Sequence, residues 1–301
     1  MKTVFAFTKR NIKLFFKDKG MFFTSLITPA ILLVLYVTFL ANVYRDSLLS
    51  NLPLGLAVSD RLVEGFVGSQ LISSILAVSC VTVAFCSNFL MVQDKSNGTH
   101  GDLCIAPVKP SVLSLGYYIA TLASTLLVCF VAAAVCLVYM AIVGWYLSVA
   151  DVLLLLLDIL LLVLFGTALS SVINFFLSTQ GQISAVGTIV SAGYGFICGA
   201  YMPISSFGVG LQRVLSFLPG TYATVLFRNH AMRGVLAGMQ DEGLPAALID
   251  ALRDAFDCNL YFFGKPVSEP MMYLVLSASV LLLVGVYIAL NVWRSRAPAK
   301  K

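Results

Sequence analysis

The sequence has few charged residues. Asp, Glu, Lys and Arg make up 11% of its 301 residues, whereas 59% are hydrophobic and the mean hydropathy is +0.95. A soluble domain is typically about 25% charged and about 45–50% apolar. The composition therefore excludes an ordinary soluble enzyme, a disordered regulator and a disulfide-stabilised scaffold. It predicts an all-α integral membrane protein that crosses the bilayer several times.

The motifs of several catalytic chemistries are missing as well. The sequence has no Gly-x-x-x-x-Gly-Lys-Ser/Thr loop to cradle phosphates, no His-Glu-x-x-His and no Gly-x-Ser-x-Gly. His100 and His230 are the only histidines, and we predict them on opposite sides of the membrane. None of the seven cysteines forms a Cys-x-x-Cys pair, which would indicate a zinc or redox site. We expect no catalytic, cofactor-binding or metal site on this chain.

Six segments are long and apolar enough to cross a bilayer, which takes about 20 residues each. They are residues 21–44, 66–92, 112–146, 152–177, 183–202 and 271–293. Twelve Lys and Arg residues flank one side of these spans, and seven lie in the longer loops of the other side. The positive-inside rule then places both termini in the cytoplasm of a multi-pass plasma-membrane protein, such as a bacterial inner-membrane protein. The location of the positive charges is more informative than their net sum of +5, so we expect the lipid bilayer and no nucleic acid as a partner.

Residues 1–20 precede the first span and carry a basic stripe. Lys2, Lys9, Arg10, Lys13 and Lys17 fall within about 100° of a helical wheel, and Phe, Ile, Leu and Val occupy the rest. This pattern favours an amphipathic helix that lies on the inner leaflet. The alternative is an ordinary positively charged flank.

The loop at residues 93–111 combines helix signals with exposed apolar residues. Thr99 and Asp102 resemble a capping box with Thr99 as the N-cap, and a short helix would stop before Pro107. Leu103 and Ile105 would then project from a cytoplasmic helix, a shape that suits docking to a soluble partner. The alternative is a simple intracellular turn.

The segment at residues 203–270 predicts a small external helical cap. Pro203 ends the fifth span, and apolar residues at helical spacing follow as far as Pro219 and Gly220, which indicates a re-entrant helix. Two further amphipathic stretches are predicted at residues 222–239 and 245–257.

Asp158 is an ionisable residue inside a predicted span, where a charge costs about 2.5–3.5 kcal/mol. It could contact substrate or a cation in the transport pathway, or it could be a carboxyl group bonded to a neighbouring Ser, Thr or Tyr. Asn88 could also lie in the pathway, although an uncharged amide in a span more simply indicates an interhelical hydrogen bond.

This arrangement resembles the type-2 permeases of ATP-binding-cassette (ABC) exporters over nearly the whole chain. Two local patterns carry the resemblance. The first is Asn97-Gly98-Thr99, Gly101-Asp102-Leu103 and Pro107 followed by residues 113–120, which resembles the family's coupling helix. The second is residues 199–205 followed by 218–222, which resembles its re-entrant segment. The chain departs from the family pattern where Gly116 and Tyr117 stand in place of a frequent Lys.

The resemblance implies that residues 1–301 form one transmembrane permease domain of an ATP-driven exporter. A second permease, either another copy or a homologue, would complete the pathway, with spans 2 and 5 lining it. A separate ATPase subunit would bind ATP and Mg. The residues implied to couple the two subunits are Thr99, Asp102, Leu103, Ile105 and Pro107.

Two other classes of protein fit the same composition. A stand-alone ion-coupled carrier or channel would transport without an ATPase and would use Asp158 as its coupling site. An integral membrane enzyme acting on lipid would need polar residues clustered at one interface, and the sequence shows no such cluster. The apolar spans favour an amphipathic or hydrophobic cargo, and export of a cell-envelope glycan is the alternative.

Overall fold

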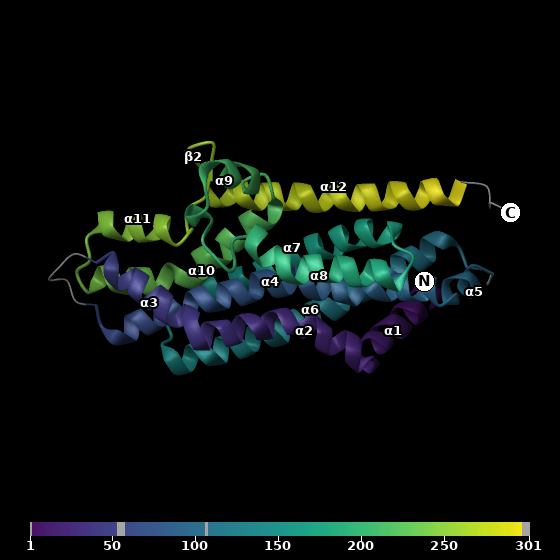
Figure 1. The fold of residues 1–301 in the computed structure, drawn as a ribbon, viewed down its shortest axis with the longest axis horizontal. Helices are drawn as coiled ribbons and strands as arrows, with labels where there is room; N and C mark the ends of the chain where they lie inside the picture. The colour runs from purple at the N-terminus through teal and green to yellow at the C-terminus, as the bar shows by residue number, and fades with distance from the viewer. Residues whose placement is uncertain (1, 53–57, 106–107, 297–301) are drawn as a thin grey trace.

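The computed structural model describes residues 2–52, 58–105 and 108–296 as an elongated bundle whose long helices follow its longest axis (Figure 1). The described N- and C-terminal residues lie at one end together with the short helix α5 (Thr99–Ile105), and we call this the α5 end. The opposite end carries α3 (Ala41–Ser50) and α11 (Ala246–Ala255) and is called the α11 end.

Within the described residues, five helices are long and apolar enough to cross a membrane, which confirms an all-α membrane fold. They are the continuous helix formed by α2 (Lys19–Leu35), a π-helical turn (Tyr36–Leu40) and α3, then α4 (Asp60–Ser96), α6 (Pro110–Val143), α7 (Val149–Phe176) and α12 (Glu269–Arg296). They correspond to predicted spans 1, 2, 3, 4 and 6. The segment predicted as span 5 forms α8 (Gln180–Ile197), which is not among these five helices.

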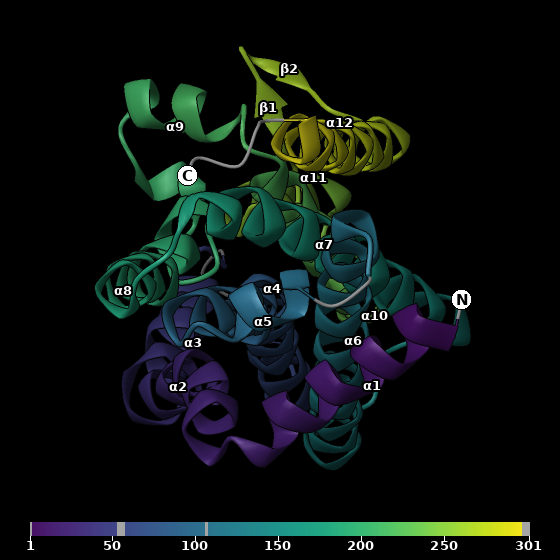
Figure 2. The same cartoon turned by 90° about the vertical axis from the view of Figure 1, so that its right-hand side faces the viewer.

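Helix α4 forms the centre of the bundle. Viewed along the long axis, α2, α6, α7 and α8 surround it (Figure 2), and its apolar window is completely buried. Ser69, Ser79 and Thr82 are tolerated there because each hydroxyl donates to the backbone carbonyl four residues earlier. Gly166 of α7 allows close approach, because a Cβ atom there would lie 3.0 Å from the carbonyl oxygen of Cys80. Small residues, and polar residues whose hydroxyl groups bond to their own helix, therefore let the helices pack tightly.

Helix α1 (Lys2–Lys17) crosses the α5 end at a steep angle to the long helices (Figure 2). Asp18 separates it from α2, and the Asp18 carboxylate accepts a hydrogen bond of 3.0 Å from the N–H of Met21. Lys2, Lys9, Lys13 and Lys17 remain exposed, whereas Phe7 and Phe15 are buried against the bundle. The amphipathic pattern of the sequence thus corresponds to one packed face and one basic face.

Helix α10 (Pro219–Asp241) differs most from the sequence-based expectation. The sequence predicts an amphipathic external stretch at residues 222–239, but α10 packs among α4, α7 and α12 and buries most of its side chains. Gly234 and Gly238 allow this approach, because a Cβ atom at Gly234 would overlap the carbonyl of Tyr146 and one at Gly238 would lie 2.9 Å from Leu62. The buried polar residues of α10 made it look like a surface helix in the sequence.

The remaining elements surround the start of α12. A 3₁₀ turn (Ile204–Ser206) and α9 (Val209–Leu215) precede α10, and α11 follows it. A small antiparallel hairpin, β1 (Tyr261–Phe262) and β2 (Lys265–Pro266), pairs Tyr261 with Pro266 and Phe262 with Lys265. Phe263 and Gly264 turn the hairpin with φ angles of 49° and 80°, which is the requirement of a type I′ turn. The sequence analysis did not predict this hairpin.

Candidate functional site

The α5 end presents the segment predicted to couple to an ATPase. Helix α5 begins at Thr99, and the N–H groups of Gly101 and Asp102 donate to the carbonyl of Gly98 at 2.8 and 3.4 Å. The residue directly before the helix is therefore Gly98, which has a φ angle of 79°. The capping-box interpretation placed Thr99 at this N-cap position. Thr99 and Asp102 lie in the first turn, and Pro107 lies outside the described residues.

The two apolar residues of α5 differ in exposure. Leu103 packs against a small cluster formed by Phe7, Met91, Leu113 and Tyr117, whereas Ile105 is 85% exposed. The sequence predicts that both side chains project from the helix. The structure instead indicates that Leu103 attaches α5 to the bundle, and Ile105 is available to a partner.

Asp94 joins three helices beside α5. Its carboxylate accepts hydrogen bonds of 2.8 and 3.1 Å from the Arg10 guanidinium of α1, and one of 2.6 Å from the Tyr117 hydroxyl of α6. The hydrogen bond to Asp94 raises the pKa of Arg10, so the guanidinium group stays charged. Gly116 is required for the contact, because a Cβ atom there would overlap the ring of Phe7. Gly116 and Tyr117, at the position where the family often has a Lys, thus hold α1 against α6 in this chain.

Lys95 joins the same corner to α7. Its ammonium group donates to the carbonyls of Asn174, Phe175 and Leu177 at 3.0, 2.8 and 2.9 Å. These carbonyls lie at the C-terminus of α7, where a cation satisfies unpaired acceptors and the helix dipole. Gln180, at the start of α8, donates to Ser96 at 3.3 Å. The end of α4, directly before α5, is therefore joined to α1, α6, α7 and α8.

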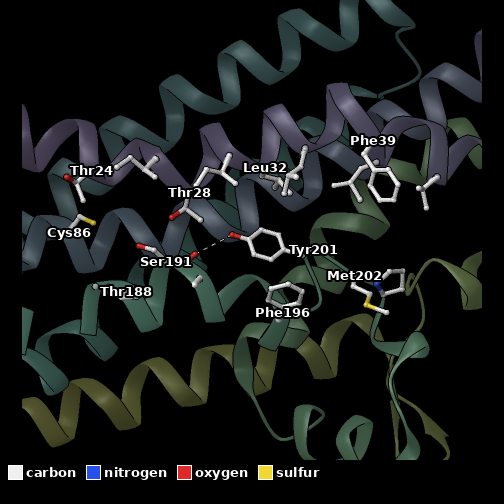
Figure 3. Close-up of a pocket in the computed structure, with 18 of the residues that line it drawn as sticks. Thr24, Thr28, Leu32, Phe39, Cys86, Thr188, Ser191, Phe196, Tyr201 and Met202 are labelled. Atoms are coloured by element: carbon white, nitrogen blue, oxygen red, sulfur yellow. Dashed lines mark hydrogen bonds between the residues drawn. The ribbon is translucent and has the colours of Figure 1, made fainter. Parts of the chain in front are cut away.

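A groove of about 1420 Å³ runs along the flank of the bundle between α2–α3 and α8 (Figure 3). Among the described residues that line it, Asp18 is the only charged residue. Most of the wall is apolar, and hydroxyl groups of Thr24, Thr28, Thr188 and Ser191 interrupt it. A typical pocket for a small molecule measures about 300–1,000 Å³. The groove therefore has room for a large amphipathic molecule.

The half of the groove nearer the α11 end is aromatic. Phe39 of the α2–α3 helix faces Phe196, Tyr201 and Met202 from α8 and the turn after it (Figure 3). The Tyr201 hydroxyl donates to the carbonyl of Ser191 at 3.4 Å. The ring of Tyr201 lies directly over Gly195, where any Cβ atom would overlap it. The turn is therefore folded back onto the last two turns of α8.

Asp158 and Asn88 are not among the residues that line the groove. Asp158 is fully buried and lies 2.6 Å from His230 Nδ1 of α10, and it accepts a hydrogen bond of 2.8 Å from the hydroxyl of Tyr273 of α12. Tyrosine was one of the predicted partner types, whereas His230 was missed because its segment was interpreted as external. Asn88 donates to Ser170 and Ser171 of α7 at 3.0 Å, as the interhelical interpretation predicted.

The residues predicted to shape a re-entrant segment lie at chain reversals. Pro203 precedes the 3₁₀ turn, and Pro219 and Gly220 open α10. Arg228 of α10 and Asp257, neither of them predicted as a site residue, form a buried ion pair of 3.1 Å below this segment. The described residues contain no group of three His, Cys, Asp or Glu side chains that could hold a metal ion.

In the described part of the chain, five helices that are long and apolar enough to cross a membrane, packed around a buried central helix, define a helical membrane protein. The chain belongs to the ABC-2 type transporter family, whose family model matches residues 2–231. It is therefore a multi-pass membrane permease of an ABC transporter, as the resemblance predicted. Among curated proteins, none matches the chain. The matched range ends within α10, before α11, the hairpin and α12.

Proposed function

We propose that this permease is the membrane subunit of an ATP-driven exporter and that a separate ATPase subunit docks on α5. Two features together carry the proposal. Ile105 is exposed on α5, and Asp94 and Lys95, at the end of α4 shortly before α5, bind neighbouring helices. A partner that pushes α5 would displace the helices that border the groove. ATP and Mg would bind to the partner, and ATP binding would close the ATPase pair.

The proposed topology places the α5 end in the cytoplasm. The exposed lysines of α1 would then lie at the inner leaflet of the plasma membrane, in agreement with the positive-inside rule. Helix α8 would serve as the fifth of six spans, because its 18 residues extend for about 27 Å, close to the hydrocarbon thickness. Residues 1–20 would form the interfacial helix and 93–111 the coupling loop. Within residues 203–270, α9 would be the re-entrant helix, and α11 and the hairpin would form the external cap beside the buried helix α10.

A second permease, either another copy or a homologue, would cover the groove and complete the pathway. The helices that border the groove keep large apolar side chains exposed, among them Phe23, Ile27 and Ile31 of α2 and Ile189 of α8. Spans 2 and 5 were expected to line the pathway. Helix α8 lines the groove along most of its length, α4 contributes Cys86, Phe89 and Gln93, and α2 supplies the opposite wall.

The same wall supports a class of cargo. A long apolar surface with scattered hydroxyl groups suits an amphipathic or hydrophobic molecule, because it offers both hydrocarbon contact and hydrogen bonds. The alternative, a stand-alone ion-coupled carrier or channel, depends on Asp158. Both of its carboxylate oxygens already contact side chains, and it is not among the residues that line the groove, so this alternative has less support.

The test is purification of the tagged chain from its host in a mild detergent, followed by mass spectrometry and an ATPase assay. We expect a stoichiometric partner with a phosphate-binding loop and ATPase activity in the eluate. A homogeneous chain without such a partner, under conditions that preserve other membrane complexes, would contradict the proposal and favour the ion-coupled carrier.

A further inference from the structure

The turn after α8 forms the wall of the groove nearest the α11 end. Tyr201, Met202, Pro203 and Ser206 all line the groove (Figure 3). The chain reverses here because Gly199 adopts a φ angle of 77°, and a Cβ atom at Gly199 would lie 2.7 Å from Ile204. A short irregular segment of this kind opens locally at low free energy unless other elements hold it.

Arg228 and Asp257 hold this turn from outside the groove. Arg228 donates one nitrogen to the carbonyl of Gly199 and the other to the carboxylate of Asp257 at 3.1 Å. The same carboxylate accepts from the backbone N–H of Ile204, and from that of Ser205 at 3.1 Å. The two side chains therefore contact both the start and the end of the turn.

Neighbouring residues fix the two side chains themselves. Asp257 follows α11 with a φ angle of 53°, a left-handed conformation that Asp tolerates better than most residues. Asn229, next to Arg228, donates to the carbonyl of Cys258 at 2.6 Å and accepts from Arg253 of α11 at 2.8 Å. Helix α10, the end of α11 and the turn thus form one connected unit.

The burial of this pair points to a role in geometry. The Arg228 side chain is 0% exposed and that of Asp257 is 8% exposed. Well-packed apolar residues often stabilise a fold as much as a buried ion pair does, because desolvation opposes the attraction of the charges. An apolar pair could not form hydrogen bonds to two backbone segments, whereas the planar guanidinium donates hydrogen bonds in fixed directions.

We propose that Arg228 and Asp257 are positioning residues for the transport pathway. They hold the turn at residues 199–205 against α10, so that the turn moves with α10 as the outer gate of the groove. The clamp itself is a property of this chain, and its role as a gate rests on the proposed function. The alternative is a pair that stabilises the whole fold without a particular effect on the turn.

The native thiol of Cys198 reports on this turn, because it lies directly before Gly199 and is 1% exposed. Modification of a buried thiol by N-ethylmaleimide follows the population of locally opened molecules. Cys80 and Cys136, which are buried elsewhere in the bundle, report on general unfolding. The modified peptides are quantified by mass spectrometry, with the full chain in native membranes and no added nucleotide.

The test variant is the double substitution Arg228→Met and Asp257→Asn. It leaves no unpaired buried charge, and Asn keeps the left-handed conformation and an acceptor for the backbone N–H groups. We expect Cys198 to react about tenfold faster or more, because the double variant removes the charge-assisted hydrogen bonds that hold the turn. Cys80 and Cys136 should keep their parental rates.

Two single variants complete the test. Arg228→Lys keeps the charge but cannot reach both partners, so its rate at Cys198 should be intermediate. Arg233→Met removes an arginine on the same helix that pairs with Asp151 and Glu269, and it should leave Cys198 unchanged. An unchanged rate at Cys198 in the double variant, or an equal rise at all three cysteines, would overturn the clamp.

The same labelling separates the clamp from the proposed function. In the purified complex of the parent chain with its ATPase, ATP and vanadate should change the Cys198 rate if the turn is a gate. No response to nucleotide would remove the gate role and would leave the nucleotide-free result on the clamp intact. The absence of any ATPase partner would contradict the proposed function alone.

Discussion

At the scale of single residues, two buried carboxylates determine which helices stay together. Asp94 binds Arg10 of α1 and Tyr117 of α6, and Asp158 contacts His230 of α10 and Tyr273 of α12. Burial of a carboxylate costs desolvation free energy, and the hydrogen-bond partners of its oxygens offset that cost. The loss of either should therefore change stability or attachment in a way that depends on its location.

We expect Asp158→Asn to destabilise the bundle without changing cargo preference. Hydrogen bonds to a charged group contribute about 1.5–3 kcal/mol, and Asp158 lies outside the groove wall. The measurements are the thermal unfolding midpoint in detergent and the stimulation of ATPase activity by a panel of amphipathic compounds. Asp250→Asn, at an exposed position on α11, is the control. Unchanged stability with an altered stimulation profile would assign Asp158 to cargo contact.

We expect Asp94→Asn to loosen α1 from the bundle, because the neutral amide binds Arg10 less strongly than a carboxylate does. Limited trypsin digestion measures the effect, since Lys9 and Lys13 lie on the exposed face of α1. Cleavage there should become faster, while cleavage in the rest of the chain stays at its parental rate. Asp102→Asn, at an exposed position on α5, should behave like the parent. Equal cleavage of α1 in Asp94→Asn and the parent would show that this carboxylate does not hold α1.

At the scale of secondary-structure elements, the two apolar residues of α5 should separate docking from folding. Ile105→Asp places a charge on a fully available side chain, so it should abolish co-purification of the ATPase while the unfolding midpoint stays unchanged. Leu103→Asp should lower that midpoint, because Leu103 packs against the cluster of Phe7 and Met91. Ile105→Leu is the matched control and should retain the ATPase. Retention of the partner by Ile105→Asp would move the docking surface away from α5.

The elements that the sequence predicts well are those with a strong local signal. Spans 1, 2, 3, 4 and 6 have long apolar runs. Helix α5 follows a glycine and is a short helical stretch that ends in an isoleucine. Helix α10 could not be predicted in this way. Arg228 and His230 are typical of a surface, and their partners Asp257 and Asp158 are 29 and 72 residues away in the chain. The groove likewise depends on the packing of α2 and α8 against α4, which no local pattern specifies.

At the scale of the whole molecule, the proposed function predicts a second permease that covers the groove. Two-fold assembly would bring the same residue of two copies close together near the axis. We expect Ile189→Cys, at a position on α8 that is 67% exposed, to cross-link to a second permease in native membranes under oxidising conditions. Cys104 would first be replaced by Ser to lower the background.

The matched control is Ile288→Cys, at a position of α12 that is 57% exposed. Helix α12 lies on a different side of the bundle from α8 (Figure 2). This variant should not cross-link, because α12 does not border the groove. A product with twice the mass of the chain from Ile189→Cys indicates a homodimer, and a product containing a different membrane protein indicates a heterodimer. Efficient cross-linking from Ile288→Cys, with none from Ile189→Cys, would place the second permease on the α12 face and leave the groove open to lipid.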